Sequence, residues 1–357
     1  MAYTNIDDPS AYFQTATYTG TNSSGNAITN DGNSDLQPDL VWIKVRTYDN
    51  PHTIQDTSRG FAGSGEVNLL QPASTAAETT NGAFESFDSN GFTVGGTNPL
   101  SRTYNASTDN YIAWQWKANG GTTSTDTTSS ITSTVQVNSD AGFSIVTYTG
   151  NGNTLGGFGH GLGVAPKVVF VKRRLTSAAN WCVYHKSMGA AYFVKLDTTD
   201  AQASGTWQAL DPSSTTVIVY NGGLVNGNGD TYVAYCFAEK QGYSKFGKYV
   251  GNGSSNGPFI YTGFKPAFVI VKKISGTGNW LVYDNKRSAY NLNDPYVYAN
   301  EASAEATSST SGYDFLSNGF KTRNTYNDGN VSGQTYIYMA FAESPFTTST
   351  GVPTTAR

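Results

Sequence analysis

The sequence contains few residues that could carry out catalysis or bind a metal. Histidine occurs only as His52, His160 and His185, and cysteine only as Cys182 and Cys236. The cysteines lack the spacing of a zinc site, so we expect two small buried hydrophobic side chains, with a disulfide between them as the open alternative. No arrangement typical of a serine hydrolase is visible. We predict no catalytic residue, no cofactor and no metal, and we interpret the protein as non-enzymatic.

Charged residues are also scarce, at 13% of the chain, and the net charge is −4. Without a long basic run we expect no nucleic-acid surface. The short basic run at residues 172–174 is interpreted as solvated charge at a strand end. No run of about 18 apolar residues is present, so we predict no membrane insertion. The first residues lack the basic and apolar regions of a signal peptide, so we expect a protein assembled in a cytoplasm.

The residues that are abundant favour β-structure. Gly, Ser, Thr and Asn are frequent, and aromatic residues make up 13% of the chain. Thr, Tyr, Phe and Val favour strands, whereas Gly and Asn favour turns. The aromatic content also supplies apolar area to bury, which argues against disorder. The composition therefore predicts an all-β protein.

Three diverged copies of one unit form the strongest pattern in the sequence. Each copy has an aromatic strand that closes in a glycine turn, a proline followed six residues later by lysine, and an asparagine six residues before a tyrosine that opens a strand. In chain order the glycines are Gly20, Gly150 and Gly251, the Pro–Lys pairs are Pro38–Lys44, Pro166–Lys172 and Pro266–Lys272, and the Asn–Tyr pairs are Asn105–Tyr111, Asn226–Tyr232 and Asn330–Tyr336. The apolar run after each proline predicts a strand buried on both faces.

The strand opened by each tyrosine alternates between bulky and small residues. In the first copy the bulky face carries Ile112, Trp114 and Trp116, and the other face carries Ala113 and Gln115. We expect the bulky face to point into a β-sandwich. Turns of the hairpin type are predicted at residues 90–91 and 318–319. The matched segments 75–78 and 302–305 are each predicted to form one helical turn on a connecting loop.

The repeat sets the expected domain limits. We predict β-sandwich repeats at 1–118, 141–240 and 241–346, a Ser/Thr-rich exposed linker at 119–140 and a flexible tail at 347–357. Because the connection between the second and third repeats is short, these two repeats are expected to pack firmly. The first repeat, with its own linker, is our candidate for an anchoring unit.

Several motifs have a functional and a structural interpretation, and we favour the structural one. The segment 156–161 does not match a phosphate-binding loop, and 225–230 is interpreted as a hairpin loop, with Ca²⁺ binding as the alternative. His185 occupies the place of Asp56 and Asp284 and is interpreted as a polar strand-end residue. Glu239 and Glu343 would form a glycosidase pair only if their copies faced each other.

The tryptophans of the repeats are interpreted as core residues. Trp181 and Trp280 occupy matched positions, which indicates shared packing. The alternative is that these two residues and Trp42 stack on sugar rings.

Together these motifs resemble a family of repeated domains from tailed phages, especially marine and cyanobacterial ones, labelled tail-fibre-like or virion structural proteins. The segments that carry the resemblance include MAYTNIDDPSAYFQTATYTG, LQPDLVWIK, FDSNGFTVG, YIAWQWKA, GHGLGVAPK, NWCVYHKSMG, TYVAYCFAEKQGYSKFG, GPFIYTGFKPAFVIVKK and TYIYMAFAESPF, and they extend from Met1 to about Phe346. The resemblance implies three tandem antiparallel β-sandwiches of lectin-like, SPRY-like or jelly-roll type. It supplies no catalytic residue.

We expect from this resemblance a virion surface protein, either a tail fibre or a capsid decoration. Its role would be adhesion to a host surface or reinforcement of the particle, with other virion proteins as partners and a homo-oligomeric assembly. The alternative is a carbohydrate-binding module that acts through aromatic loops on a host-surface glycan. A hydrolase of surface polysaccharide is the third hypothesis.

Overall fold

The computed structural model describes residues 3–96, 101–175, 178–205 and 210–355, and this part of the chain is almost entirely β-structure. Within it, the helical elements are α1 (Ser101–Tyr104) and the 3-10 turns η1 (Pro9–Ala11) and η2 (Lys186–Met188). Every pairing between its named strands is antiparallel, as the pairing of β1 with β9 illustrates. The predicted all-β class with antiparallel sheets is confirmed. No helix of the described residues has the length and apolar character needed to cross a bilayer.

We define module 1 as strands β1 to β9, which form a six-stranded sheet and a three-stranded sheet. The large sheet contains, in spatial order, β1 (Phe13–Thr19), β9 (Asn110–Trp116), β3 (Leu40–Val45), β4 (Thr53–Asp56), β5 (Val67–Leu70) and β6 (Thr79–Asn81). The small sheet contains β2 (Asn26–Thr29), β8 (Gly91–Val94) and β7 (Phe84–Asp88).

Module 2 repeats this plan with additional strands at both edges of the large sheet. The large sheet contains β10 (Ser124–Asp126), β11 (Ser133–Asn138), β12 (Phe143–Thr149), β19 (Thr231–Phe237), β14 (Val168–Arg173), β15 (Cys182–His185), β16 (Tyr192–Lys195) and β17 (Ala203–Ser204). The small sheet contains β13 (Gly156–Gly159) and β18 (Thr216–Val219).

Module 3 returns to the plan of module 1. Its large sheet contains β20 (Ser244–Val250), β28 (Thr335–Pro345), β22 (Phe264–Lys273), β23 (Trp280–Asp284), β24 (Pro295–Tyr298) and β25 (Ala306–Thr307). Its small sheet contains β21 (Phe259–Tyr261), β27 (Gly319–Thr322) and β26 (Tyr313–Leu316). Strands β1, β12 and β20 are therefore equivalent, because they pair with the equivalent strands β9, β19 and β28.

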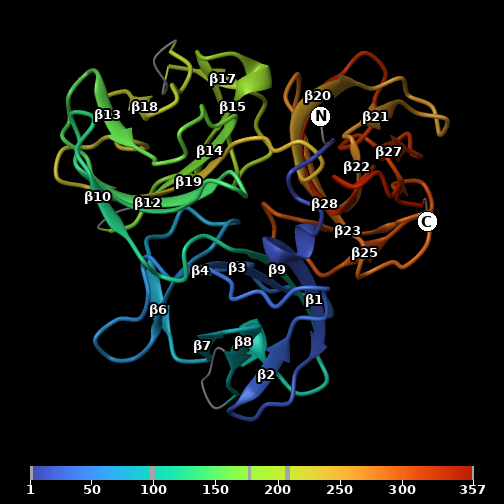
Figure 1. The fold of residues 1–357 in the computed structure, drawn as a ribbon, viewed down its shortest axis with the longest axis horizontal. Coiled ribbons are helices and arrows are strands. Elements are labelled where there is room, and N and C mark those ends of the chain that lie inside the picture. The colour runs from blue at the N-terminus through green and yellow to red at the C-terminus, as the bar shows by residue number, and fades with distance from the viewer. Residues whose placement is uncertain (1–2, 97–100, 176–177, 206–209, 356–357) are drawn as a thin grey trace.

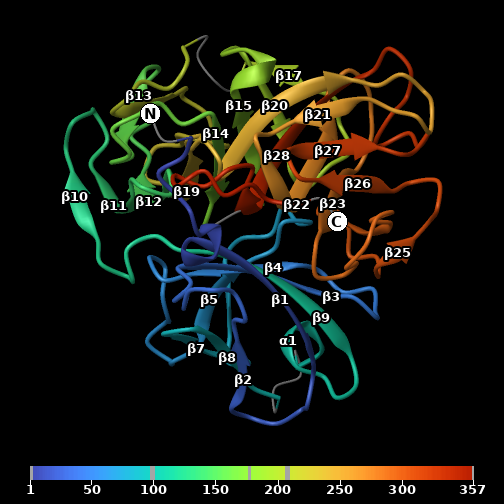
Figure 2. The same cartoon turned by 45° about the vertical axis from the view of Figure 1, so that its right-hand side comes forward.

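The three modules are grouped around a common centre and form one three-lobed body (Figures 1 and 2). One apolar cluster at this centre contains side chains of every large sheet. The ring of Phe341 lies 5.2 Å from the ring of Phe13, 5.6 Å from that of Trp116 and 5.8 Å from that of Phe237, measured between centroids. Residues from all three modules are thus buried against one another, and this shared burial stabilises the arrangement of the modules as well as their folds.

The predicted direction of the bulky strand faces is wrong. Trp114, Tyr235 and Met339, which hold matched positions on β9, β19 and β28, all point into the common core and not into their own sandwiches. The smaller faces, represented by Ala113 and Ala234, pack inside modules 1 and 2. Alternation reveals that a strand has two faces, but both faces are buried here, so it could not reveal which face meets which partner.

The predicted exposed linker at 119–140 is also not what the structure shows. Strands β10 and β11 lie in this segment, and β11 pairs over its whole length with residues 143–148 of β12. Serine and threonine, which suggested a solvated linker, are equally compatible with an edge strand. The matched loops 75–78 and 302–305 contain no helical turn and run in irregular, extended form.

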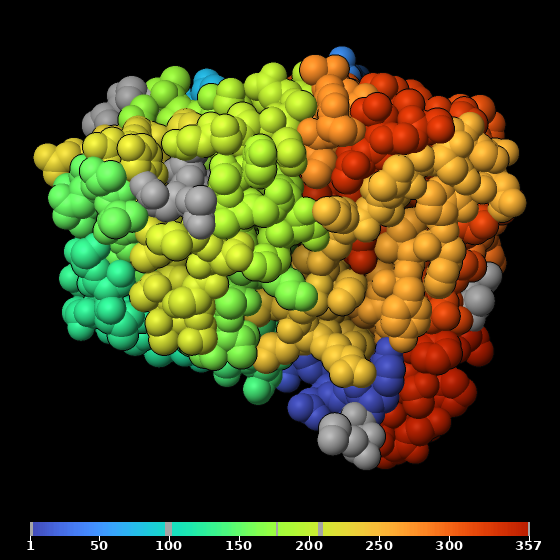
Figure 3. All heavy atoms as spheres, turned by 90° about the horizontal axis from the view of Figure 1, so that it is seen from above, coloured from blue at the N-terminus to red at the C-terminus, as the bar shows by residue number. Residues whose placement is uncertain are grey.

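The two ends of the described chain lie close together. Near the lower edge of Figure 3 the blue N-terminal residues adjoin the red C-terminal ones. The backbone N–H of Ser349 donates to Asp7 at 2.6 Å, and residues 347 and 353 form a β-bridge. The tail predicted to be flexible is therefore folded back as a turn up to residue 355, and its last two residues lie outside the described part of the chain.

Candidate functional sites between and beside the modules

The lysine of each Pro–Lys marker joins its own module to the next one. Lys44, Lys172 and Lys272 are buried, and their ammonium groups donate to backbone carbonyls of a neighbouring module, at Ala302 (2.9 Å), Thr75 (3.0 Å) and Thr199 (3.0 Å) respectively. Burial lowers the pKa of each lysine to about 8. The matched lysines thus form a cyclic set of contacts: module 1 binds module 3, module 2 binds module 1, and module 3 binds module 2.

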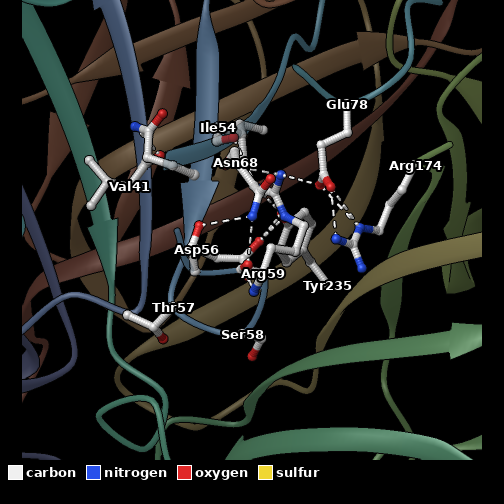
Figure 4. A network of polar contacts seen from close by, with 12 residues as sticks. Val41, Ile54, Asp56, Thr57, Ser58, Arg59, Asn68, Glu78, Arg174 and Tyr235 are labelled. Carbon is white, nitrogen blue, oxygen red and sulfur yellow. Dashed lines mark hydrogen bonds and ion pairs between the residues drawn. The ribbon is translucent and has the colours of Figure 1, made fainter. Parts of the chain in front are cut away.

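A buried ion network reinforces the contact between modules 1 and 2 (Figure 4). The guanidinium of Arg59 donates to Asp56 at 2.5 Å and to Glu78 at 2.9 Å, and Glu78 accepts from Arg174 of module 2 at 2.7 Å. The hydroxyl of Tyr235, also from module 2, donates to Asp56 at 2.7 Å. Burial alone would lower the pKa of Arg59, but the charges around it, that of Asp56 foremost, outweigh burial and raise the pKa above its usual value.

The contact between modules 3 and 1 contains the same network in matched positions. Arg287 donates to Asp284 at 2.6 Å and to Glu305 at 3.2 Å. Glu305 also accepts from Arg46 of module 1 at 2.8 Å, and the indole N–H of Trp114 donates to Asp284 at 3.1 Å. In both modules the aspartate ends an equivalent strand and the arginine follows it by three residues, so one local turn produces each ion pair.

The contact between modules 2 and 3 has lost this network at every position. His185 replaces the aspartate and Met188 the arginine. By register, Gln202 replaces the glutamate and Ile274 the second arginine. The backbone N–H of Gln202 donates to the backbone carbonyl of Ile274, just as the backbone N–H of Glu78 donates to the backbone carbonyl of Arg174. Met188, Ile274 and Met339 instead belong to the common apolar core. Five positions have therefore changed together from ionic or hydrogen-bonding to mainly apolar residues.

The three histidines are buried and serve local hydrogen bonds. His52 accepts from the Trp42 indole at 2.9 Å, and His160 accepts from the backbone N–H of Leu162 at 3.2 Å. His185 accepts from the Ser187 N–H and lies 3.1 Å from the carbonyl of Tyr338 in module 3. Burial lowers the pKa of all three, to about 4 for His185. His160 and His185 thus bind backbone groups, and His52 binds the Trp42 side chain.

The Asn–Tyr pairs of the repeat stabilise the turn that precedes β9, β19 and β28 through hydrogen bonds. Asn330 is fully buried, accepts from the Asn252 N–H at 2.9 Å and donates to the carbonyls of Ser254 and Asn324 at 2.8 and 2.7 Å. The hydroxyl of Tyr336 accepts from the Val331 N–H and donates to the Asn327 carbonyl. Asn105 and Asn226, with their tyrosines, make corresponding bonds to their own loops.

The glycine that ends the aromatic strand lies against this turn. A Cβ atom at Gly251 would come within 2.3 Å of the Val331 carbonyl oxygen, and at Gly20 it would come within 2.1 Å of the Ala106 oxygen. The repeated glycine thus permits a close backbone approach that a side chain would block.

Several residues with two interpretations are structural here. Trp42, Trp181 and Trp280 are buried, so the interpretation that they stack on sugars is wrong and the core interpretation is confirmed. Cys182 and Cys236 form no disulfide and are buried on strands β15 and β19, which lie on opposite sides of β14.

The basic run at 172–174 is not solvated, which corrects the prediction. Lys172 is buried, Arg173 pairs with Asp230 at 3.1 Å, and Arg174 pairs with Glu78. Asp230 belongs to the 225–230 loop, for which Ca²⁺ binding was the alternative interpretation, and its carboxylate pairs with Arg173. No group of three or more His, Cys, Asp or Glu residues suited to a metal occurs in the described residues.

The two matched glutamates, Glu239 and Glu343, both form ion pairs with lysine. Glu239 pairs with Lys167 and, at 3.3 Å, with Lys245. Glu343 pairs with Lys265 at 2.9 Å and accepts from Asn285 at 2.8 Å. Each carboxylate therefore has a lysine partner.

Two surface features are not explained by contacts between the modules. The outer face of the small sheet in module 3 carries Phe259 and Tyr261, which are 46% and 53% exposed. The positions that correspond to them by register carry Ala27 and Thr29 in module 1. The second feature is a cleft of about 660 Å³ between β1 of module 1 and the strands and turns of module 3.

The fold and these contacts define an all-β protein in which three related modules share one core. Most of the buried polar groups described above serve turns and contacts between modules. The model of one protein family, described as a domain of unknown function (DUF7483), matches residues 8–345. This match covers all three modules, so the chain belongs to that family. No curated protein matches the sequence.

Proposed function

We propose that this chain is a non-enzymatic structural protein on the surface of a tailed-phage particle. The observation that carries the proposal is the fusion of three modules into one body through a common core and buried ion networks. Such a body is suited to hold its shape under load and to present its outer loops. The resemblance of the chain to virion proteins supports a location on the particle, and we propose adhesion to the host or reinforcement of the particle as its role.

Particle composition tests this proposal. Purified particles of a tailed phage that carries the coding sequence should contain the chain in many copies, as measured by quantitative mass spectrometry. Immunogold electron microscopy should then place it on the tail or on the capsid. If the chain is abundant in infected cells but absent from purified particles, the proposal fails.

Carbohydrate binding is the second candidate, and the exposed pair Phe259 and Tyr261 favours it. These rings lie two residues apart on β21, so they share one face, and Tyr3 reaches Tyr261 at 3.2 Å between hydroxyl oxygens. Exposed rings with polar groups nearby can stack on sugars. Binding to a glycan array should fall when Phe259 and Tyr261 are both changed to Ala. Tyr290→Ala is the control, because Tyr290 is 78% exposed on a loop.

We propose no hydrolytic activity. The carboxylates Glu239 and Glu343 are held by lysine partners. Incubation of the purified chain with host polysaccharide should release no reducing ends, and their appearance in proportion to the amount of protein would contradict the proposal.

A further inference from the structure

The three equivalent edge strands, β1, β12 and β20, differ in what lies on their outer side. In module 2, β11 pairs along β12 and so covers its edge. In module 3, the edge of β20 is protected, because the Phe246 N–H donates to the Glu239 carboxylate at 2.8 Å and Lys245 and Lys248 lie on the same strand. In module 1, β1 ends the sheet, and no described strand pairs with its outer side.

The outer side of β1 presents backbone groups that a further strand could bind. The Tyr12 carbonyl and the Gly20 N–H, at the two ends of β1, both bond to residues flanking β9. Because antiparallel ladders alternate with a period of two, the even positions face β9 and the odd positions face outward. The N–H and C=O groups of Thr15 and Thr17 therefore point away from the sheet. Thr17 is exposed, whereas Thr15 is 4% exposed and its hydroxyl donates to Asn285 of module 3 at 3.1 Å.

The contact made by β11 in module 2 shows what the chain itself places at such an edge. Gln136 lies opposite Ile145 and is fully buried between modules 1 and 2. Its amide donates to the hydroxyls of Thr57 (2.9 Å) and Ser58 (2.8 Å), and its carbonyl accepts from the Gly121 N–H at 3.0 Å. One strand thus extends the sheet and bridges two modules.

The cleft beside β1 is the matched position at the contact between modules 3 and 1. Thr15 of β1 corresponds to Ile145, and Asn285 and Lys286 of module 3 correspond to Thr57 and Ser58; all three line the cleft. The walls carry charged side chains as well as apolar ones such as Phe13: Lys286 pairs with Asp31 at 2.6 Å, and Glu343 also lines the cleft. The place that Gln136 fills in one contact is a cleft of about 660 Å³ in the other.

We infer that β1 and this cleft accept an extended segment of a partner polypeptide, which adds as an antiparallel strand. The partner segment resembles β11: it is rich in Ser, Thr and Val, and it places an amide side chain opposite Thr15, within reach of Asn285 and Lys286. Main-chain bonds to β1 provide affinity and the amide side chain provides selectivity. This inference is independent of the location on a phage, because it concerns the purified chain.

A labelled peptide with the sequence of residues 131–140 serves as the probe, because it contains the strand that fills the matched site. Fluorescence anisotropy with the full chain should show saturable binding. Replacing the peptide's equivalent of Gln136 by Leu should weaken binding by about tenfold, which is about 1.4 kcal/mol. A scrambled peptide should not bind.

Thr17→Lys on the protein is the decisive variant, because it copies Lys248, which occupies the matched position on the protected edge of β20. It should weaken binding at least about tenfold without changing the melting temperature. Thr29→Lys, on an exposed position of β2, is the matched control and should bind normally.

Hydrogen exchange locates the bound peptide. Protection should increase at residues 13–19. Protection confined to residues 143–149 would mean that the peptide replaces β11 and would overturn the inference, as would binding that Thr17→Lys leaves unchanged or no saturable binding. A dimer of the chain that Thr17→Lys abolishes would also overturn it, because the edge would then serve self-association.

Discussion

The ion network around Arg59 allows a sharp test of how the modules are held together. Arg59→Met removes a guanidinium that contacts Asp56 at 2.5 Å and Glu78 at 2.9 Å, and both carboxylates then stay buried without it. Breaking a buried ion pair in this way costs about 3–5 kcal/mol. We expect the free energy of unfolding, measured by denaturation in urea, to fall by that amount.

The contact between modules 2 and 3 shows how the same site can be built without charge. A coordinated variant of the first contact would carry the residues found at the five matched positions. It contains Asp56→His, Arg59→Met, Glu78→Gln, Arg174→Ile and Tyr235→Met. Because replacing a whole buried network by well-packed residues is often close to neutral, we expect this variant to be more stable than Arg59→Met alone.

A surface arginine gives the control for this comparison. Arg323 is 44% exposed and lies 3.5 Å from Asp314, so Arg323→Met should cost less than about 1 kcal/mol. The reasoning is refuted if the five-residue variant is as unstable as Arg59→Met, or if Arg59→Met costs no more than Arg323→Met.

Three further predictions concern single residues. Burial lowers the pKa of His185 to about 4, against an ordinary value of 6.5, so the unfolded chain binds more protons between these pH values. The neutral, buried His185 therefore contributes up to about 3 kcal/mol of stability, which is present above pH 6.5 and is lost as the pH falls to 4. His185→Asn should therefore lose less stability than the natural chain over that pH range in urea titrations, and parallel losses would contradict this. Asn330→Ala removes a fully buried side chain with several hydrogen bonds and should lower the free energy of unfolding by about 2–4 kcal/mol, whereas Asn256→Ala, on an exposed turn, should change it by less than about 0.5 kcal/mol. Burial raises the pKa of Cys236 to about 12, so its thiol should react with a disulfide reagent only after unfolding, and rapid reaction of the native chain would show that the site is open.

The structure could be predicted from the sequence at repeated positions where each residue has one local structural role. The strands after Pro38 and Pro166 are buried on both faces as predicted, because a continuous apolar run permits little else. The Asn–Tyr spacing marked a real structural unit, although its hydrogen bonds to the preceding loop became visible only in three dimensions. At the Asn–Tyr pairs, the constant spacing in the sequence therefore corresponds to a constant set of contacts in the folded chain.

Contacts between modules were harder to predict. Trp114 and Ala113 both lie on buried faces, so hydrophobicity could not assign one to the common core and the other to the sandwich. Strand β11 was missed because Ser133 and Thr134 continue the preceding Ser/Thr-rich stretch, which resembles a linker. One signal could have revealed the ion networks: the Asp–Arg pair three residues apart recurs at Asp56 and Asp284, with a glutamate 21 or 22 residues further on.

The ion network between modules 3 and 1 lies where the chain restricts the pairing of modules least. Modules 2 and 3 are joined by the short segment 238–243, so the chain itself restricts how they can meet. Modules 3 and 1 have no such direct connection, because β28 and β1 lie at opposite ends of the chain. Among three similar modules, a wrong pairing would bury Asp284 or Glu305 opposite an apolar residue such as Ile274, and an unpaired buried charge is strongly unfavourable. The buried network between modules 3 and 1 therefore favours the correct pairing where the chain restricts it least. Modules 1 and 2 have the same network although the segment 117–123 joins them directly, so the connection between modules does not by itself decide where a network occurs.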